Sequence, residues 1–169
     1  SELNTLIDGG HQQKGRRGGT ENVPGLVGMG AAAEVSARAI ANGEENAVAV
    51  LRDQLITGIE ANVEGAFLNG HRTNRIPGVV NFSFDGIEGE GLILEMDAKA
   101  GVCLSTGSAC AAGSLDPSPV LLAIGVPNGL ARAGTRFSLG RDNTKEEVDS
   151  VVQLLPEVLS SLRALKPSG

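Results

Sequence analysis

The sequence predicts a compact α/β fold in which helices flank a small sheet, and three observations lead to this fold class. First, the chain has 169 residues, of which 41% are hydrophobic, which is enough to build one core. Second, segments that alternate apolar and polar residues, as strands do, are interleaved with segments that carry the longer period of helices. Third, a strongly periodic helix closes the chain, and no internal repeat interrupts this order.

The N-terminal part predicts a loop followed by a helix. Residues 1–19 are rich in glycine and arginine and read as a loop. Asn22 is a residue type that caps helix N-termini, and Pro24 falls in the first turn, where a missing N–H costs little. The helix is expected to end near Ala41, because the Asn42-Gly43 pair that follows is a plausible C-terminal stop.

The middle of the chain predicts alternating helices and strands. Apolar residues recur at helical spacing from Glu44 to Val63, which predicts a second helix. Shorter helical segments are expected over 88–101 and within 117–125. The expected strands lie within 66–70, 78–86, 102–105 and 134–140.

The last helix is the clearest element. Thr144 is followed at the third position by Glu147, which is the pattern of a capping box. One apolar stripe follows at helical spacing, made of Val148, Val151, Leu155, Val158, Leu162 and Leu165.

Composition excludes several classes of function. The net charge is −6, the chain has four Phe and neither Trp nor Tyr, and nucleic-acid binding is therefore disfavoured. No apolar run reaches the roughly 18 residues of a membrane span, and the first residues do not resemble a signal peptide. Two cysteines are too few for a disulfide scaffold, so a cytoplasmic, reducing compartment is the expectation.

The two cysteines differ in their surroundings. Cys110 ends the run STGSAC and is followed by AAGS, so its neighbours in sequence supply no apolar wall. A thiol on such a loop is placed for exchange or nucleophilic attack, whereas the alternative is the buried thiol that free cysteines often form. Cys103 lies between Val102 and Leu104, and we expect it to be buried and structural. No second pair of ligands accompanies them, so no metal site is predicted.

Two further features suit anionic groups. The run GRRGGTENV places two arginines, two glycines and Thr20 directly before a helix start, which suits a phosphate, and a solvated loop is the alternative. Arg136 lies in a predicted strand on the face opposite Phe137. An arginine in that position is either solvated or holds a carboxylate bidentately.

Four stretches together resemble the C-terminal part of cysteine desulfurases. They read GGHQQKGRRGGTENVPGLVGMGAA, VNFSFDGIEGEGLILEMD, STGSACAAGSLDPSPVLLAIGVP and TRFSLGRDNTKEEVD. The resemblance is to the NifS-like class of iron–sulfur cluster assembly, in the class V aminotransferase superfamily, and it extends from about Leu6 to Leu165. It implies the small C-terminal domain of a fold-type I pyridoxal-phosphate enzyme, preceded by a loop and helix that pack on a large domain.

The resemblance also implies roles for three residues. Cys110 is the nucleophile that takes sulfur from L-cysteine, leaving L-alanine, and becomes a persulfide. Thr20 contacts the phosphate of pyridoxal 5′-phosphate in the neighbouring subunit of a homodimer. Arg136 binds the α-carboxylate of the substrate. The persulfide sulfur then passes to an iron–sulfur scaffold or another acceptor.

The sequence departs from the family in its lysines. Lys14, Lys99, Lys145 and Lys166 are its lysines, and none follows the Ser-x-His pattern of the family's Schiff-base lysine. Family members are also much longer. The expectation is therefore a chain that is inactive alone and needs the missing large domain or a complementary chain.

These inferences combine into a domain division and two alternatives. Residues 1–43 are expected to form the phosphate-contacting loop and linking helix, and residues 44–169 the small α/β domain with the mobile cysteine loop. The alternative is a stand-alone domain that relays sulfur or binds a partner without enzyme activity. A related aminotransferase is disfavoured, because transamination needs no thiol nucleophile.

Overall fold

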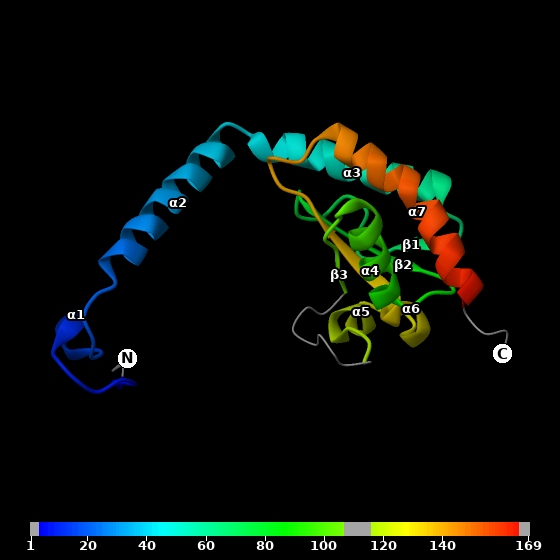
Figure 1. The fold of residues 1–169 in the computed structure, drawn as a ribbon. Coiled ribbons are helices and arrows are strands. Elements are labelled where there is room, and N and C mark those ends of the chain that lie inside the picture. The colour runs from blue at the N-terminus through cyan, green and yellow to red at the C-terminus, as the bar shows by residue number, and fades with distance from the viewer. Residues whose placement is uncertain (1–3, 107–115, 166–169) are drawn as a thin grey trace. The chain divides into compact units, whose positions relative to one another are not determined.

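The computed structural model describes residues 4–106 and 116–165, and it confirms an α/β fold with a small sheet flanked by helices (Figure 1). The chain divides into two compact units. Unit 1 comprises residues 1–42 and unit 2 comprises residues 43–169. Each unit is built around its own elements.

Unit 1 contains a tight turn and one long helix. The turn, α1 (Gln12–Gly15), lies in the segment expected to be a loop, and Gln13 and Lys14 adopt left-handed backbone angles there. The helix, α2 (Val23–Ala41), begins where the sequence predicts, because Oδ1 of Asn22 accepts the Gly25 N–H at 3.1 Å. None of the side chains of α2 is buried.

Unit 2 contains the sheet and the remaining helices. In chain order its elements are α3 (Glu44–Asn62), β1 (Ala66–Leu68), β2 (Val79–Phe84), α4 (Gly89–Ala100), β3 (Ser105–Thr106), α5 (Pro119–Ala123), α6 (Asn128–Arg132), β4 (Gly134–Ser138) and α7 (Lys145–Leu165). The strands pair antiparallel in the order β1-β2-β4-β3. The late strand β4 therefore lies between two strands that precede it by a long stretch of chain.

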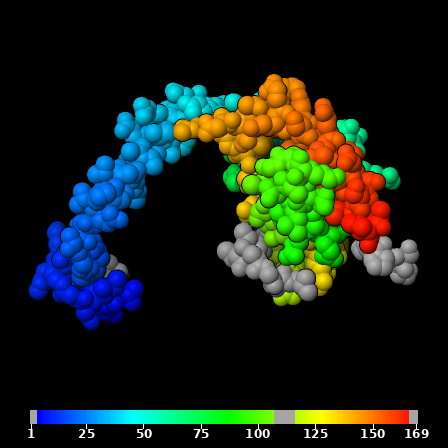
Figure 2. All heavy atoms as spheres, viewed as in Figure 1, coloured from blue at the N-terminus to red at the C-terminus, as the bar shows by residue number. Residues whose placement is uncertain are grey.

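One face of the sheet forms the core. Val80, Phe82 and Phe84 of β2 are fully buried there, and Phe137 of β4 pairs directly with Val80. Helices α3, α4 and α7 cover this face, and α3 and α7 run side by side (Figure 1). In the space-filling view, the atoms of α4 in green meet those of α7 in orange and red (Figure 2). Alternation along β2 and β4 thus separates a hydrophobic face from a polar one.

The start of α7 confirms the predicted capping box. Oγ1 of Thr144 accepts the Glu147 N–H at 3.2 Å, and Oε2 of Glu147 accepts the Thr144 N–H at 3.0 Å. The side chain of Asn143 also donates to Glu147 at 3.0 Å. The hydrogen bond from Asn143, and after it the bond from the Thr144 N–H, lower the pKa of the Glu147 carboxyl from its ordinary value.

One prediction of local structure is wrong, and one short helix was not predicted. A strand is expected over 102–105, but the observed strand is confined to Ser105–Thr106. The residues before it form the C-terminal cap of α4 instead. Gly101 adopts φ 63°, its N–H bonds the Asp97 carbonyl, and the Val102 N–H bonds the Met96 carbonyl. Helix α6 was not expected, since five residues are too few to show a helical period.

Among the described residues, no helix combines the length and the apolar character that crossing a bilayer requires.

Candidate functional site

Arg136 lies on the polar face of the sheet, which we define by Asn81, Ser83, Ser105 and Arg136. Its neighbour Phe137 is 3% exposed on the opposite face, which confirms the orientation predicted for the strand. The Arg136 side chain is half-buried. Its Nε is fully buried and has no hydrogen-bond partner among residues 4–106 and 116–165. A guanidinium with a buried, unsatisfied N–H suits an anionic ligand.

The polar face carries an ordered amide beside Arg136. Asn81 of β2 is the direct cross-strand partner of Arg136. Nδ2 of Asn69, which follows β1, donates to Oδ1 of Asn81 at 2.7 Å and to Oγ of Ser83 at 2.8 Å. Asn69 is 8% exposed and Ser83 is fully buried, so these bonds satisfy groups that water cannot reach.

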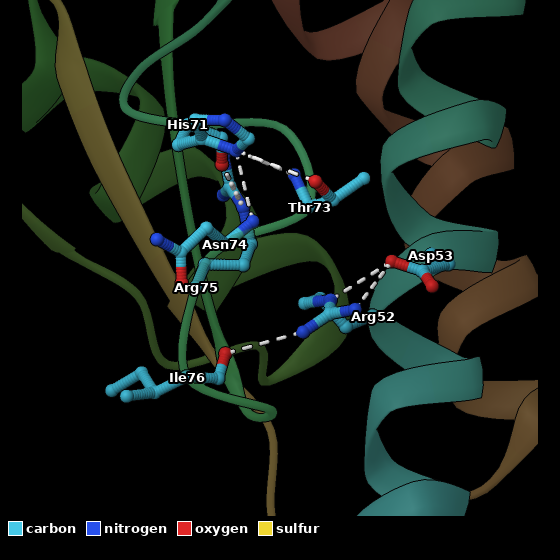
Figure 3. Close-up of polar contacts among 7 residues, drawn as sticks. All are labelled: Arg52, Asp53, His71, Thr73, Asn74, Arg75 and Ile76. Carbon is cyan, nitrogen blue, oxygen red and sulfur yellow. Dashed lines mark hydrogen bonds and ion pairs between the residues drawn. The ribbon is translucent and has the colours of Figure 1, made fainter.

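Arg52 of α3 holds the segment 69–78, which links β1 to β2, and Arg75 stabilises that segment from within (Figure 3). Arg75 donates to the backbone carbonyls of His71 at 2.8 Å and Asn69 at 3.2 Å. Arg52 of α3 has a side chain only 9% exposed, pairs with Asp53 at 2.8 Å and reaches the Ile76 carbonyl at 3.4 Å. The pKa of Arg75 is lowered from its ordinary value, mainly because the side chain is partly buried and secondly because the positive charge of Arg52 is near.

The same segment is tied a second time to α3. Arg72 forms a two-pronged ion pair with Glu60, at 2.6 and 2.7 Å, and this bond lowers the pKa of the Glu60 carboxyl from its ordinary value. His71 is exposed, and its Nδ1 accepts the backbone N–H groups of Thr73 and Asn74. The Nδ1 atom of His71 is therefore engaged within its own loop.

Thr20 lies in unit 1, between a glycine pair and the start of α2, and its side chain is exposed. Gly18 is buried, and its N–H bonds the Ile7 carbonyl at 2.7 Å. A Cβ at Gly18 would lie 2.7 Å from the Asp8 carbonyl oxygen, so only glycine fits there. The exposed Thr20 side chain therefore follows a backbone segment that packs closely against residues 7–9.

Arg17 does not contribute its guanidinium to this exposed surface. It pairs with Glu21 and donates to the carbonyls of Gly18 and Gly19. Gln13 donates to the same Glu21 carboxylate at 2.7 Å. In the described structure the Arg17 guanidinium is thus engaged within its own loop, and its ion pair with Glu21 offsets the negative charge next to Thr20.

Cys110 lies outside the described residues. The strand that leads toward it, β3, pairs Ser105 with Arg136 and Thr106 with Thr135. Cys103 is exposed, so the prediction that it is buried is wrong. Its backbone leaves the end of α4 rather than joining the sheet, and it borders a pocket of about 490 Å³ whose apolar lining includes Leu55 and Val148.

The structure brings together some residues that the sequence did not connect. Arg136 was identified as a candidate, whereas Asn69 and Asn81 were not. The only sequence signal at Asn81 is its polar position in an alternating strand. Its place beside Arg136 depends on the pairing of β2 with β4, which the sequence does not reveal. Thr20 and Arg136 belong to different units.

Comparisons with known proteins identify the family. The aminotransferase class-V family matches residues 7–151. A cysteine desulfurase of Gluconacetobacter diazotrophicus is 46% identical over 165 residues, which are 98% of this chain and 41% of that protein. The cysteine desulfurase IscS of Clostridium botulinum is 45% identical over 168 residues, covering 98% of this chain and 42% of that protein.

Solved structures agree with these relatives. A NifS-like protein superposes with a TM-score of 0.81 at 31% identity, over 96% of this chain and 40% of that one. A cysteine desulfurase of Thermococcus onnurineus shares the fold, with a TM-score of 0.67 at 21% identity. The chain thus spans about two fifths of the length of the proteins it matches. It belongs to the class-V aminotransferase family and is similar to cysteine desulfurases over one part of their length.

Proposed function

We propose that this chain is the C-terminal portion of a pyridoxal-phosphate-dependent cysteine desulfurase. The complete enzyme converts L-cysteine to L-alanine and leaves the sulfur as a persulfide on Cys110, for iron–sulfur cluster assembly or another acceptor. The observation that carries the proposal is the buried, unsatisfied Nε of Arg136, beside the strand that leads toward Cys110. The similarity to proteins named cysteine desulfurase supports the reaction class.

Arg136 would bind the substrate α-carboxylate. A guanidinium presents parallel N–H groups that match the two oxygens of a carboxylate, and such charge-assisted bonds are the stronger kind. Arg136 extends from β4, and the next residue, Phe137, is buried in the core on the opposite face of that strand. The substrate would therefore be held by a rigid element rather than by a loop.

Cys110 would receive the sulfur. Thr106 pairs with Thr135, the neighbour of Arg136, and Cys110 follows Thr106 by four residues, which span at most about 14 Å when fully extended. The thiolate of Cys110 attacks the substrate sulfur, and the carbon–sulfur bond breaks with its electron pair left on carbon. L-Cysteine and the enzyme thiol thus give L-alanine and the persulfide without an external oxidant.

The loop around Thr20 fits a phosphate. Its exposed hydroxyl, the glycine backbone before it and the N-terminus of α2 after it form a donor set of the kind that binds phosphate. Thr20 would hold the cofactor phosphate of the neighbouring subunit in a homodimer. When bound, pyridoxal 5′-phosphate supplies the electron sink for the reaction.

The surface of α2 supports the view that further protein covers it. Val23, Val27 and Met29 are each more than half exposed, and α2 has no buried residue. A helix that is largely apolar is normally buried against a neighbour, and the relatives are long enough to supply one.

A segment exchange tests the proposal. This chain replaces the matched 41% of the Gluconacetobacter diazotrophicus cysteine desulfurase, so that the lysine-bearing remainder comes from the relative. We expect the exchanged enzyme to release alanine and sulfide from L-cysteine in the presence of a thiol reductant. Cys110→Ser is expected to abolish both products, while the matched change Cys103→Ser leaves them unchanged.

Two results would contradict the proposal. One is an exchanged enzyme that is folded and binds the cofactor but does not turn over cysteine. The other is turnover by the chain alone, which would show that no further portion is needed. Sulfur transfer through Cys110 without alanine production would favour a sulfur-relay domain instead.

A further inference from the structure

We propose that Asn81 is a second carboxylate-binding residue, whose amide N–H groups act together with the guanidinium of Arg136. The inference deepens the proposed function and rests on it for the identity of the ligand, the carboxylate of an amino acid. Asn81 and Arg136 are direct cross-strand partners on the polar face, so their side chains extend to the same side of the sheet.

The hydrogen bonds of Asn81 determine which end of its amide is available. Its Oδ1 accepts from Nδ2 of Asn69 at 2.7 Å, so the carbonyl end is directed at Asn69. In the part of the chain that the structure describes, Nδ2 of Asn81 binds no acceptor. The same polar face thus presents a half-buried amide donor beside a guanidinium whose Nε is buried and unsatisfied.

This donor set matches a carboxylate in charge and number. A carboxylate offers about four acceptor positions on two oxygens, more than one guanidinium edge fills. The Asn81 amide supplies the next donors without adding charge. Ser105, on the other side of Arg136, donates instead to the Thr106 carbonyl at 3.1 Å. Asn81 is therefore the neighbour with donors to offer.

Asn69 is a positioning residue in this arrangement. Its own N–H bonds the Asn81 carbonyl at 2.9 Å, and its buried side chain bridges Asn81 and Ser83. Arg75 in turn bonds the Asn69 carbonyl, and Arg52 holds the far end of the segment at Ile76 (Figure 3). Arg52 and Arg75, drawn in Figure 3, thus stabilise the segment that orients the Asn81 amide.

The first experiment measures carboxylate binding by the 169-residue chain itself, with acetate as the probe. NMR signals of the Asn81 side-chain amide and of the Arg136 Nε–H are expected to shift together during the titration. Asn81→Ala is expected to raise the dissociation constant about tenfold, because one charge-assisted hydrogen bond contributes about 1.4 kcal/mol or more. Asn81→Asp keeps the shape and the acceptor for Asn69, and its negative charge is expected to weaken binding further.

The second experiment uses the segment-exchanged enzyme with two substrates. Cysteamine is cysteine without the carboxylate, so Asn81→Ala should raise KM for cysteine about tenfold and leave cysteamine unaffected. Asn69→Ala should raise the cysteine KM by a smaller factor, because it acts through Asn81. Asn46→Ala, an exposed residue of α3, is the matched control and should change neither substrate.

The outcomes separate this inference from the proposed function. If the exchanged enzyme is inactive but acetate binds through Asn81 and Arg136, the carboxylate site stands and the desulfurase proposal fails. If the enzyme is active and Asn81→Ala matches Asn46→Ala in both experiments, the inference is overturned. A loss that is equal for cysteine and cysteamine would also overturn it, since it would reflect a structural role.

Discussion

Replacing Arg136 with methionine is expected to lower kcat/KM for L-cysteine by about a hundredfold or more in the segment-exchanged enzyme. Removing one partner of a desolvated, hydrogen-bonded charge pair costs about 2–5 kcal/mol, and each 1.4 kcal/mol is about a tenfold change. Methionine keeps a long, flexible side chain but has no donor. Steady-state turnover of cysteine measures the effect, and cysteamine, which lacks the carboxylate, should lose far less.

The same substitution should not destabilise the chain. In the described structure, Nε of Arg136 is buried without a partner, and such a group costs about 1–3 kcal/mol of stability. Its removal is expected to leave the free energy of unfolding unchanged or higher. Arg141→Met is the matched control, because that side chain is 60% exposed and only 4.0 Å from the exposed Asp142. Equal losses of activity in the two variants would refute the role of Arg136.

Phe82→Ala is expected to lower the free energy of unfolding by about 3–5 kcal/mol, the usual cost of removing a buried aromatic ring. Phe82 is fully buried in the centre of β2, and its ring centroid lies 5.9 Å from that of Phe84. It pairs with Leu68 on one side and Thr135 on the other, so it contributes to both strand interfaces. A loss of this size is a large fraction of a typical domain's free energy of unfolding.

Urea denaturation of the 169-residue chain measures this loss, followed by far-ultraviolet circular dichroism because the chain has neither Trp nor Tyr. Phe67→Ala is the matched control. Phe67 is in the adjacent strand β1, and it is 48% exposed. A change below about 1 kcal/mol for Phe82→Ala, or equal changes in the two variants, would show that the core is not where the structure places it.

Local rules of sequence account for the elements that were predicted well. The Asn22 cap and the Thr144–Glu147 capping box each involve residues three apart, so the sequence contains every partner. The alternation along β2 and β4 also predicts which side chains face the core, including the outward direction of Arg136. These features need no knowledge of how distant segments pair.

Features that depend on distant pairing were not predictable. Asn81 and Arg136 are 55 residues apart by number and become neighbours only because β4 inserts between β2 and β3. The exposure of Cys103 has a local cause, although its apolar neighbours Val102 and Leu104 suggested burial. The glycine-terminated end of α4 extends through Val102, so Cys103 leaves a helix rather than entering a strand. Apolar neighbours in sequence therefore did not predict burial.

The central claim is that sulfur from cysteine is received by Cys110 of this chain. Its most direct test is mass spectrometry of the segment-exchanged enzyme after brief exposure to L-cysteine, with alkylation under non-reducing conditions and fragment ions that separate Cys110 from Cys103. The account predicts one added sulfur atom on Cys110 and none on Cys103, although Cys103 is exposed. Added sulfur on Cys103, or alanine formed while both thiols remain unmodified, would contradict it.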